Sequence, residues 1–161
     1  TVRTVVLDSG TEFQTADLAD IVYAEVNNPS KKSRTSLDDL TQRDYGINST
    51  RMKRIFRMFR DANVNFIVTA LSKEITNDDG KIIEILPYFT PKVGEALMGY
   101  VDYVWYLYVD NTGKRKLLTQ PKGPFRAKTR GFAFAEKLGA QVEDPDLSEI
   151  FKLTGATSKK K

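Results

Sequence analysis

The sequence contains no cysteine and no histidine among its 161 residues. This excludes disulfides, metal sites built on thiolate or imidazole ligands, and catalysis by a serine–histidine or cysteine–histidine pair. Any chemistry must therefore come from carboxylates, lysine, arginine and hydroxyl groups. Long apolar runs are also missing, because the stretch Tyr103–Val109 is far shorter than a membrane span, and no signal-peptide pattern opens the chain. We expect a cytoplasmic protein that does not contact a membrane.

The net charge of +4 is modest, but the basic residues are unevenly distributed. Between Asp110 and Gly131 there are seven basic residues and one acidic residue. This concentration suits a polyanionic partner, and it equally suits a solvated surface, so charge alone leaves both interpretations open. With 40% hydrophobic residues the chain can bury one core. We expect a single domain over residues 1–155, followed by a disordered basic tail at 156–161.

The first half of the chain alternates between strand and helix patterns. Strands are predicted over Thr1–Leu7 and Val64–Ala70, where apolar and β-branched residues cluster and indicate burial. One helix is predicted from Thr15 or Ala16 to Val26 and a second over Ser49–Ala62, with a polar loop at Ser30–Arg43 between them. The second helix has apolar residues on one face, at Met52, Ile55, Phe56 and Phe59. The order strand, helix, strand is typical of parallel pairing with right-handed crossovers.

The second half of the chain contains hairpin signals instead. Asp78-Asp79-Gly80 predicts one turn, and Asp110–Gly113 predicts another between strands at Tyr103–Val109 and Arg115–Thr119. A last helix is predicted over Pro145–Leu153. The sequence therefore predicts an α/β fold, with a mostly parallel central sheet flanked by helices and antiparallel hairpins toward the C-terminus. Since the chain opens inside a strand, we expect it to be a fragment or a processed product.

An acidic residue ends the first predicted strand, in Val5-Val6-Leu7-Asp8-Ser9. Ligands of open parallel sheets bind outside the carboxyl ends of the strands, which places Asp8 at the floor of such a site. In P-loop NTPases an acid in this position holds Mg²⁺, often through water. The alternative is that Asp8 caps the helix that follows. Ser9 is a candidate for nucleotide contact, and Glu12 is a candidate either to position the attacking water or to favour the helix N-terminus.

The second predicted strand also ends in polar residues, at Thr69, Ser72 and Lys73. A polar side chain at this position is a candidate to contact the γ-phosphate or the attacking water. Ordinary polarity at the end of a strand explains the same pattern. These residues alone therefore do not choose between the two interpretations.

A group of cations lies in Phe125–Gly131. If this segment is extended, Arg126, Lys128 and Arg130 project from one face. Two or three cations on one edge suit the charge of a triphosphate, because arginine offers a planar fork and lysine a point charge. Contact with a DNA backbone, or simple solvation, is the alternative.

Several segments of the chain together resemble phage-encoded RecA-like nucleotide-binding proteins, which are P-loop ATPases of DNA recombination. The segments lie in the family's order over nearly the whole chain: Val5–Phe13, Arg57–Arg60, Asn63–Leu71, Gly99–Val104 and Ala127–Arg130. The resemblance implies a RecA-like core in which Asp8 is the Walker B acid and the Thr69 region is the sensor strand. It also implies that Lys128 and Arg130 are the Lys-x-Arg finger pair, which reaches into a neighbour's ATP site in hexamers and filaments.

The chain departs from that family at the phosphate-binding loop. The family opens with a Walker A loop, G-x-x-x-x-G-K-[ST], and the 161 residues contain no such run. Gly80-Lys81 and Gly113-Lys114 lack the first glycine and the closing hydroxyl, and both fall in predicted hairpin turns. We expect the loop to precede Thr1 or to belong to a second chain. Leu71 is a smaller departure, because the family often has a polar residue near it.

The sequence thus predicts the C-terminal part of an ATP- and Mg²⁺-dependent ATPase that binds single-stranded DNA in recombination or annealing. The resemblance implies a phage origin, a location in the host cytoplasm, and self-association into a ring or filament. Exposed aromatics such as Tyr88, Phe89 or Phe125 are expected to help a basic loop follow the DNA backbone. The alternative is a non-catalytic, degenerate RecA-like module that binds only DNA or a protein.

Overall fold

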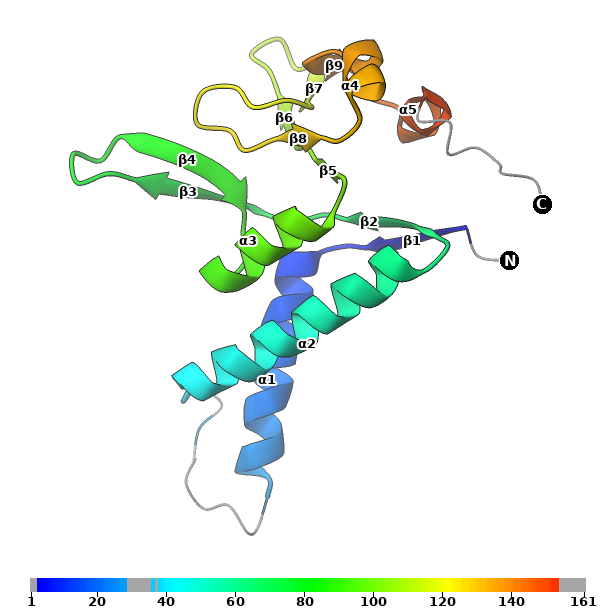
Figure 1. Ribbon diagram of the computed structural model, residues 1–161. Helices are drawn as coiled ribbons and strands as arrows, with labels where there is room; N and C mark the ends of the chain where they lie inside the picture. The colour runs from blue at the N-terminus through cyan, green and yellow to red at the C-terminus, as the bar shows by residue number, and fades with distance from the viewer. Residues whose placement is uncertain (1–2, 29–35, 37, 154–161) are drawn as a thin grey trace. The chain divides into compact units, whose positions relative to one another are not determined.

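The computed structural model describes residues 3–28, 36 and 38–153 (Figure 1). The predicted tail at 156–161 and most of the predicted polar loop's first half lie outside these ranges. The chain forms two compact units: unit 1 comprises Thr1–Lys73 and Pro87–Tyr100, and unit 2 comprises Glu74–Leu86 and Val101–Lys161. The predicted mixed α/β character is confirmed. That both units belong to one domain over 1–155 stays a prediction.

Unit 1 combines a parallel strand pair with three helices. Strand β1 (Thr4–Leu7) pairs in parallel with β2 (Asn65–Val68), which places Leu7 opposite Val68. The helices are α1 (Gly10–Val26), α2 (Gln42–Asp61) and α3 (Pro91–Tyr100). The predicted order of strand, helix and parallel strand is therefore confirmed for this pair. A mostly parallel central sheet is not seen among the residues that the structure describes.

Helix α1 begins at Gly10, about five residues before its predicted start. Ser9 is the N-cap residue, and its hydroxyl oxygen accepts a hydrogen bond from the backbone N–H of Glu12 at 3.3 Å. Gly10 allows the helix to approach the sheet closely. A Cβ at this position would lie 2.7 Å from Cγ1 of Val68 and 2.8 Å from Cζ of Phe89.

Helix α2 also begins earlier than predicted, at Gln42 rather than Ser49. Its first turn is closed by Asp44, whose carboxylate accepts hydrogen bonds from the Thr41 backbone N–H at 2.7 Å and hydroxyl at 2.8 Å. Asp44 and Asn48 are fully buried on the inward side of this helix. Because these inward positions are polar, hydrophobic periodicity does not reveal the first two turns.

The core of unit 1 is aromatic and aliphatic, at Met52, Phe56, Phe89, Val93 and Leu97. Phe56 packs edge-on against Phe66 and Phe89, with ring centroids 5.4 Å and 6.4 Å apart. The prediction that Phe89 is an exposed aromatic is wrong, because its ring is 6% exposed and belongs to this core. The prediction that the first strand is buried is wrong, because Val5 and Leu7 are half-buried and Val6 is 58% exposed.

A buried polar network joins the helices of unit 1. The side-chain amide of Gln14 donates to Oδ1 of Asn48 at 2.8 Å and to the hydroxyl of Thr90 at 2.9 Å. The carbonyl oxygen of the same amide accepts from the Thr90 backbone N–H at 3.0 Å. Asn48 in turn donates to Oδ2 of Asp17 at 2.8 Å. The network therefore links α1, α2 and the residue before α3.

The predicted hairpins are confirmed. Strands β3 (Ser72–Thr76) and β4 (Ile82–Pro87) form one hairpin, which crosses the boundary between the two units along the chain. The second hairpin lies in unit 2 and joins β6 (Tyr106–Val109) to β7 (Arg115–Leu118) in antiparallel register. The turn of this hairpin is closed by Gly113, whose N–H donates to the Asp110 carbonyl oxygen at 3.0 Å.

Unit 2 also contains elements that the sequence patterns did not predict. These are β8 (Lys128–Thr129), α4 (Phe132–Leu138) and β9 (Gln141–Glu143), whereas β5 (Tyr103–Val104) is the first part of the strand predicted at Tyr103–Val109. Strand β9 extends the β6–β7 sheet, and β5 pairs with β8. The terminal helix α5 (Leu147–Leu153) matches its prediction closely. The buried residues of this unit include Leu117, Leu138 and Ile150. None of the helices in the described ranges is long and apolar enough to cross a membrane.

Candidate functional site

The structure brings Asp8 and Thr69 together. Asp8 follows β1 and Thr69 follows β2, and the carboxyl ends of parallel strands meet at one edge of a sheet. The hydroxyl of Thr69 donates a hydrogen bond to Oδ1 of Asp8. The backbone repeats the link, because Thr69 N–H donates to Leu7 O at 3.1 Å and Gly10 N–H donates to Thr69 O at 2.8 Å. Both side chains are exposed, so this acid and hydroxyl are accessible to a ligand.

Asp8 is not the cap of helix α1. The cap is Ser9, whose hydroxyl is occupied by the Glu12 backbone N–H. The peptide bond between Asp8 and Ser9 is cis. Asp8 therefore stands between strand and helix with its carboxylate directed to Thr69, and the helix-cap alternative for this residue is removed. Ser9 is predicted to contact the nucleotide, but its hydroxyl caps helix α1.

The other predicted residues of this edge lie nearby in the fold of unit 1. Glu12 is exposed in the first turn of α1. Ser72 and Lys73 open strand β3, and the ammonium of Lys73 lies 5.8 Å from the centroid of the Tyr88 ring. Ser72 is exposed and Lys73 is half-buried. Of the three polar residues predicted after the second strand, Thr69 is the one that contacts Asp8.

Thr11 is a residue of this edge that sequence reasoning missed. Its side chain is buried at 8% exposure. The hydroxyl donates to the Tyr88 carbonyl oxygen at 3.0 Å and accepts from the Leu71 backbone N–H at 3.1 Å. Thr11 therefore fixes the segment that follows Thr69. The sequence offered one signal, a threonine three residues after the acid in the first turn of a helix.

The donor set around Asp8 fits a magnesium ion that is held mainly by water and phosphate. Within the described ranges no group of three or more acidic side chains gathers in a way that could hold a metal. The side-chain hydrogen bond of Asp8 uses Oδ1. Because Mg²⁺ keeps several waters and takes one or two carboxylates from the protein, a single exposed aspartate is sufficient.

In unit 2 the structure groups Lys128 with Arg130. The ammonium of Lys128 donates to the Val101 carbonyl oxygen at 2.7 Å. Burial, and then the nearby charge of Arg130, lower the pKa of Lys128, and Asp102 opposes this shift. The guanidinium of Arg130 pairs with Asp102 at 3.1 Å. Both cations are thus held against the segment 101–102.

Arg126 takes a different direction from the other two cations. Its side chain forms an ion pair with Glu84 on strand β4. Its backbone N–H donates to the Ile85 carbonyl oxygen at 2.9 Å. The structure therefore separates Arg126 from Lys128 and Arg130, although the three alternate along the chain. This difference arises because Phe125 and Arg126 pair with Ile85 of β4, whereas Lys128 and Thr129 pair with β5.

An open pocket of about 550 Å³ lies beside Lys128 in unit 2. Its wall is formed by Gln120, Pro121, Ala127, Lys128, Thr129, Phe132, Ala135 and Glu136. The wall is mainly apolar, and Phe132 is 87% exposed. The candidate finger cation thus borders an accessible apolar surface.

Comparison with protein families finds one match, to the family described as AAA domain, over residues 1–131. No curated protein matches the chain, and no solved structure matches it. The matched part includes Asp8 and Thr69 of unit 1, and Lys128 and Arg130 of unit 2. Since the match covers most of the sequence, the chain belongs to the AAA domain family, a family of AAA-type P-loop ATPase-like proteins.

Proposed function

We propose that this chain is the Walker B and sensor part of a RecA-like ATPase that acts on single-stranded DNA in recombination or annealing. The observation that carries the proposal is the contact between Asp8 and Thr69 at the carboxyl ends of two parallel strands. Membership of the AAA domain family supports nucleotide binding in general. The RecA-like class, with its mostly parallel sheet, and the phage origin rest on the sequence resemblance.

The proposal gives each residue of the sheet edge a role. Asp8 would hold Mg²⁺ through water, and the ion would neutralise charge on the phosphates of ATP. Glu12 would orient the attacking water, and Thr69 would contact the terminal phosphate or this water. Ser9 would approach the nucleotide through its backbone, because its hydroxyl caps the helix. Thr11 would position Thr69 by holding the next segment.

The remaining parts of the site come from elsewhere. Lys128 and Arg130 would reach the ATP of a neighbouring subunit in a ring or filament, whereas Arg126 would have to leave its ion pair with Glu84 to contact the nucleotide. The phosphate-binding loop would be contributed from outside these 161 residues, because none of them forms the G-x-x-x-x-G-K-[ST] run. Tyr88 would contact DNA, because its side chain is 48% exposed. Phe125 is less available for this role, because its ring packs on Tyr106 with ring centroids 4.6 Å apart.

The test replaces Asp8 by Asn in the protein together with its phosphate-binding loop. The change removes a charge but almost no volume, so the melting temperature should move little. ATP hydrolysis should fall by about 100-fold or more, which is the usual effect of removing one electrostatic contact to the reacting phosphate. Asp78→Asn, an exposed carboxylate on the β3–β4 turn, serves as the control and should retain full activity. Turnover of Asp8→Asn within about tenfold of wild type would overturn the Walker B role.

A second function is favoured by one specific observation, the missing phosphate-binding loop within this sequence. In that case the chain is a degenerate RecA-like module that binds DNA or a protein without catalysis. The same assay discriminates the two functions. The module predicts no ATP hydrolysis by wild-type protein above that of Asp8→Asn, whereas DNA binding is equal in both.

A further inference from the structure

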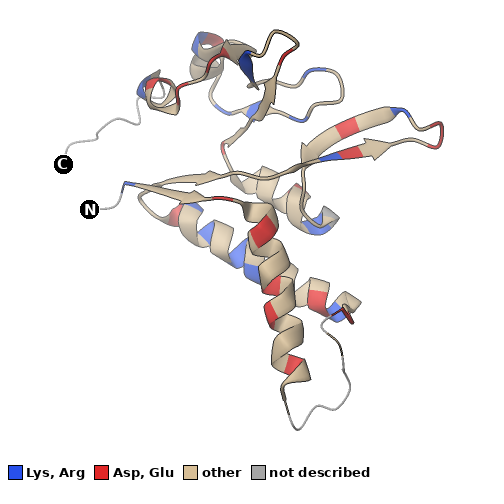
Figure 2. Ribbon diagram, turned by 180° about the vertical axis from the view of Figure 1, so that it is seen from behind, with Lys and Arg blue, Asp and Glu red and all other residues tan. Residues whose placement is uncertain are grey.

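Helix α2 presents a row of cations along its outward surface. Between residues 51 and 60 it carries five basic residues and no acidic one: Arg51, Lys53, Arg54, Arg57 and Arg60. Figure 2 shows blue segments along part of this helix. The inward side of α2 is occupied by Met52 and Phe56, which are 0% and 3% exposed. The basic side chains therefore lie around the surface that the core leaves open.

Two of the five cations are neutralised by acids. Arg51 pairs with Asp17 at 3.0 Å and with Asp20 at 3.3 Å, which ties α2 to α1. Arg60 pairs with its neighbour Asp61 at 2.7 Å. Lys53, Arg54 and Arg57, by contrast, form no ion pair with any acid in the part of the chain that the structure describes. Three positive charges on this face are thus outside the ion pairs of the described residues, and the contact of Arg57 with Asp61 is electrostatic only.

Tyr100, the last residue of α3, orders the cations instead of neutralising them. The guanidinium of Arg57 donates to the Tyr100 hydroxyl at 2.6 Å, and its carbon lies 4.9 Å from the ring centroid. The guanidinium carbon of Arg60 lies 5.6 Å from the same ring. A neutral aromatic partner fixes a guanidinium without cancelling its charge. Arg57 is therefore partly pre-organised as an anion-binding group.

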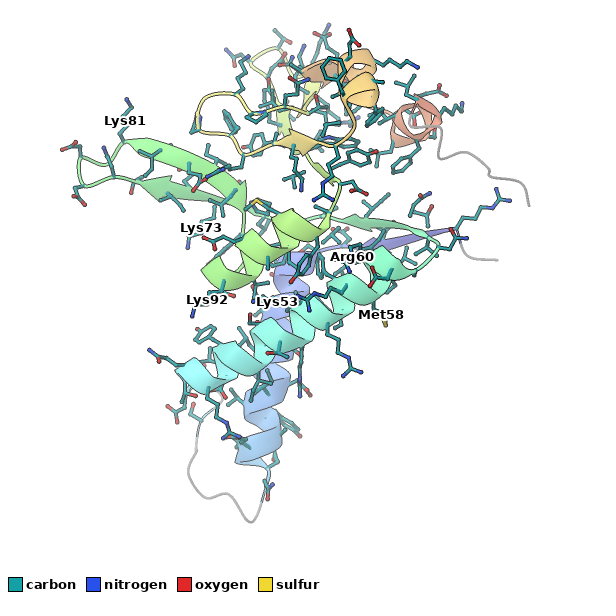
Figure 3. All side chains as sticks on the ribbon, in the orientation of Figure 1. Lys53, Met58, Arg60, Lys73, Lys81 and Lys92 are labelled. Atoms are coloured by element: carbon teal, nitrogen blue, oxygen red, sulfur yellow. The ribbon has the colours of Figure 1, made fainter. Side chains whose placement is uncertain are left out.

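The cations also share one line on the helix. Lys53, Arg57 and Arg60 fall at i, i+4 and i+7, so they face the same side over about 10 Å of helix. Arg54 lies one helical turn before Arg57 at the edge of this row. Figure 3 labels Lys53 and Arg60 on α2, with Met58 on the same helix. A linear row of this kind matches an extended anion better than a single carboxylate.

We propose that this face of α2, together with Tyr100, binds the phosphate backbone of single-stranded nucleic acid. The surface belongs to unit 1, whereas the basic stretch 110–131 belongs to unit 2, so the surface adds a second contact to the proposed function. It rests on that function only in the choice of single-stranded DNA as the ligand. Arginine is the residue best suited to phosphate, because its planar fork can bind two oxygens at once.

A membrane surface fits these observations less well. A helix that lies in a membrane interface inserts its apolar side, and the apolar side of α2 is already packed in the core with Phe89, Val93 and Leu97. The largest exposed apolar side chain among the cations is Met58, at 58% exposure. One methionine is too small an anchor for insertion. An acidic polypeptide is the remaining competitor, and it enters the test below.

The test measures binding of a fluorescein-labelled mixed-sequence 30-nucleotide single strand by anisotropy across a salt series. The triple variant Lys53→Gln/Arg54→Gln/Arg57→Gln should bind about 10-fold or more weakly near 0.1 M salt. Its slope of log K against log salt should be shallower by about 2, because each lost phosphate contact on a single strand removes about 0.7. The control Lys81→Gln/Lys137→Gln/Lys152→Gln removes the same charge from exposed sites elsewhere and should lose less than about 3-fold.

A second variant guards against loss of folding. Lys53→Gln/Arg54→Gln breaks no hydrogen bond of the described residues and leaves the contact between Arg57 and Tyr100 intact. It should show about two thirds of the change in slope, with an unchanged melting temperature. Lys53→Arg in an otherwise wild-type protein keeps the positive charge, so this variant should bind the single strand at least as tightly as wild type.

Three outcomes would overturn the inference: equal losses in the triple variant and its control, no binding of the single strand by wild type, or tighter binding of polyglutamate than of the oligonucleotide. ATP hydrolysis measured without DNA should be the same in wild type and in the triple variant. The two claims therefore fail separately. Loss of the α2 effect leaves the Asp8 result standing, and an active Asp8→Asn variant leaves the α2 effect standing.

Discussion

Units 1 and 2 hold their candidate catalytic groups through different kinds of partner. In unit 1, Asp8 lies between the end of β1 at Leu7 and the helix cap at Ser9, and its side chain is held by Thr69, 61 residues away. In unit 2, Lys128 and Arg130 are placed by partners distant in the chain, at Val101 and Asp102. The acid is exposed with a hydroxyl as its partner, whereas the cations are held by a carbonyl and a carboxylate. Under the proposed function, the exposed acid would bind its ligand in place, whereas the cations would first have to leave their own contacts.

The interiors of the two units differ in their buried polar groups. Both units pack aromatic rings: Phe56 has two edge-on neighbours in unit 1, and Tyr103 stacks on Trp105 in unit 2 with ring centroids 5.2 Å apart. The buried hydrogen bonds of unit 1 join side-chain amides, whereas those of unit 2 involve threonine hydroxyls. Thr119 is fully buried, and its hydroxyl donates to the Gly139 carbonyl oxygen. The Thr119 carbonyl oxygen accepts from Thr129, which in turn accepts from the Trp105 indole at 2.9 Å.

The largest expected effect tests whether Arg130 of unit 2 and Asp8 of unit 1 take part in the same ATPase reaction. Arg130→Ala in the protein with its phosphate-binding loop should slow ATP hydrolysis by about 10³- to 10⁵-fold, as loss of an arginine finger does. Because the finger is proposed to act on a neighbour, mixing this variant with inactive Asp8→Asn should restore part of the activity. The measurement is steady-state hydrolysis of the mixture against each variant alone.

Arg126→Ala is the matched control for this prediction. Its side chain pairs with Glu84 rather than with the segment 101–102, so its loss should cost much less activity than that of Arg130. Failure of the mixture to recover activity, although labelled subunits are seen to exchange, would contradict action between subunits. The cations of unit 2 would then serve their own subunit or DNA.

A smaller effect concerns the close packing of helix α1 in unit 1. Gly10→Ala should destabilise unit 1 by about 1–3 kcal/mol, because the new methyl group would press on Val68 and Phe89. Gly46→Ala is the control, since a Cβ there meets nothing within 4 Å in helix α2, and it should stabilise by about 0.5–1 kcal/mol. Chemical denaturation of both variants measures the difference. A Gly10→Ala protein as stable as wild type would show that α1 can move away from the sheet.

The smallest effect concerns the pH dependence of unit 2. The Thr112 hydroxyl, with the backbone N–H groups of Lys114 and Thr112, lowers the pKa of Asp110 from 3.8 to about 2. A carboxyl with a lowered pKa stabilises the folded state above its ordinary pKa, and this contribution is lost as the pH falls from about 4 to about 2. The protection of the β6–β7 turn against amide hydrogen exchange, relative to the intrinsic rate at each pH, should therefore fall in that range. Asp110→Asn should show lower protection already at pH 6, and this protection should change little on acidification.

The local parts of this architecture could be predicted from the sequence. The turns at Asp78–Gly80 and Asp110–Gly113, the helix near Leu147–Leu153 and the acid after the first strand all depend on neighbouring residues. Helix α3 was missed although it has a signal, because Val93, Leu97 and Tyr100 repeat at helical spacing after Pro91. The apolar run from Tyr103 to Val109 was predicted as one strand, but it is divided into β5 and β6.

What could not be predicted depends on partners far along the chain. The partner of Thr69 is 61 residues away, and those of Lys128 and Arg130 are 27 and 28 residues away. Phe89 is predicted from the sequence to be exposed, but its ring is buried. The position of the ring in the core depends on Phe56, which lies on helix α2. Single-sequence patterns carry no information about such pairs.

The polar network of unit 1 has a consequence for the uniqueness of the fold. The amide of Gln14 donates and accepts at the same time, and Asn48 completes the match from α2. If α2 slid by one turn along α1, the apolar side chain of Met52 or the charged side chain of Asp44 would face this amide. Each polar group stranded in this way would cost about 1–3 kcal/mol. Aromatic packing tolerates such slippage more readily than these hydrogen bonds do. The amides of Gln14 and Asn48 therefore favour a single alignment of α1 and α2.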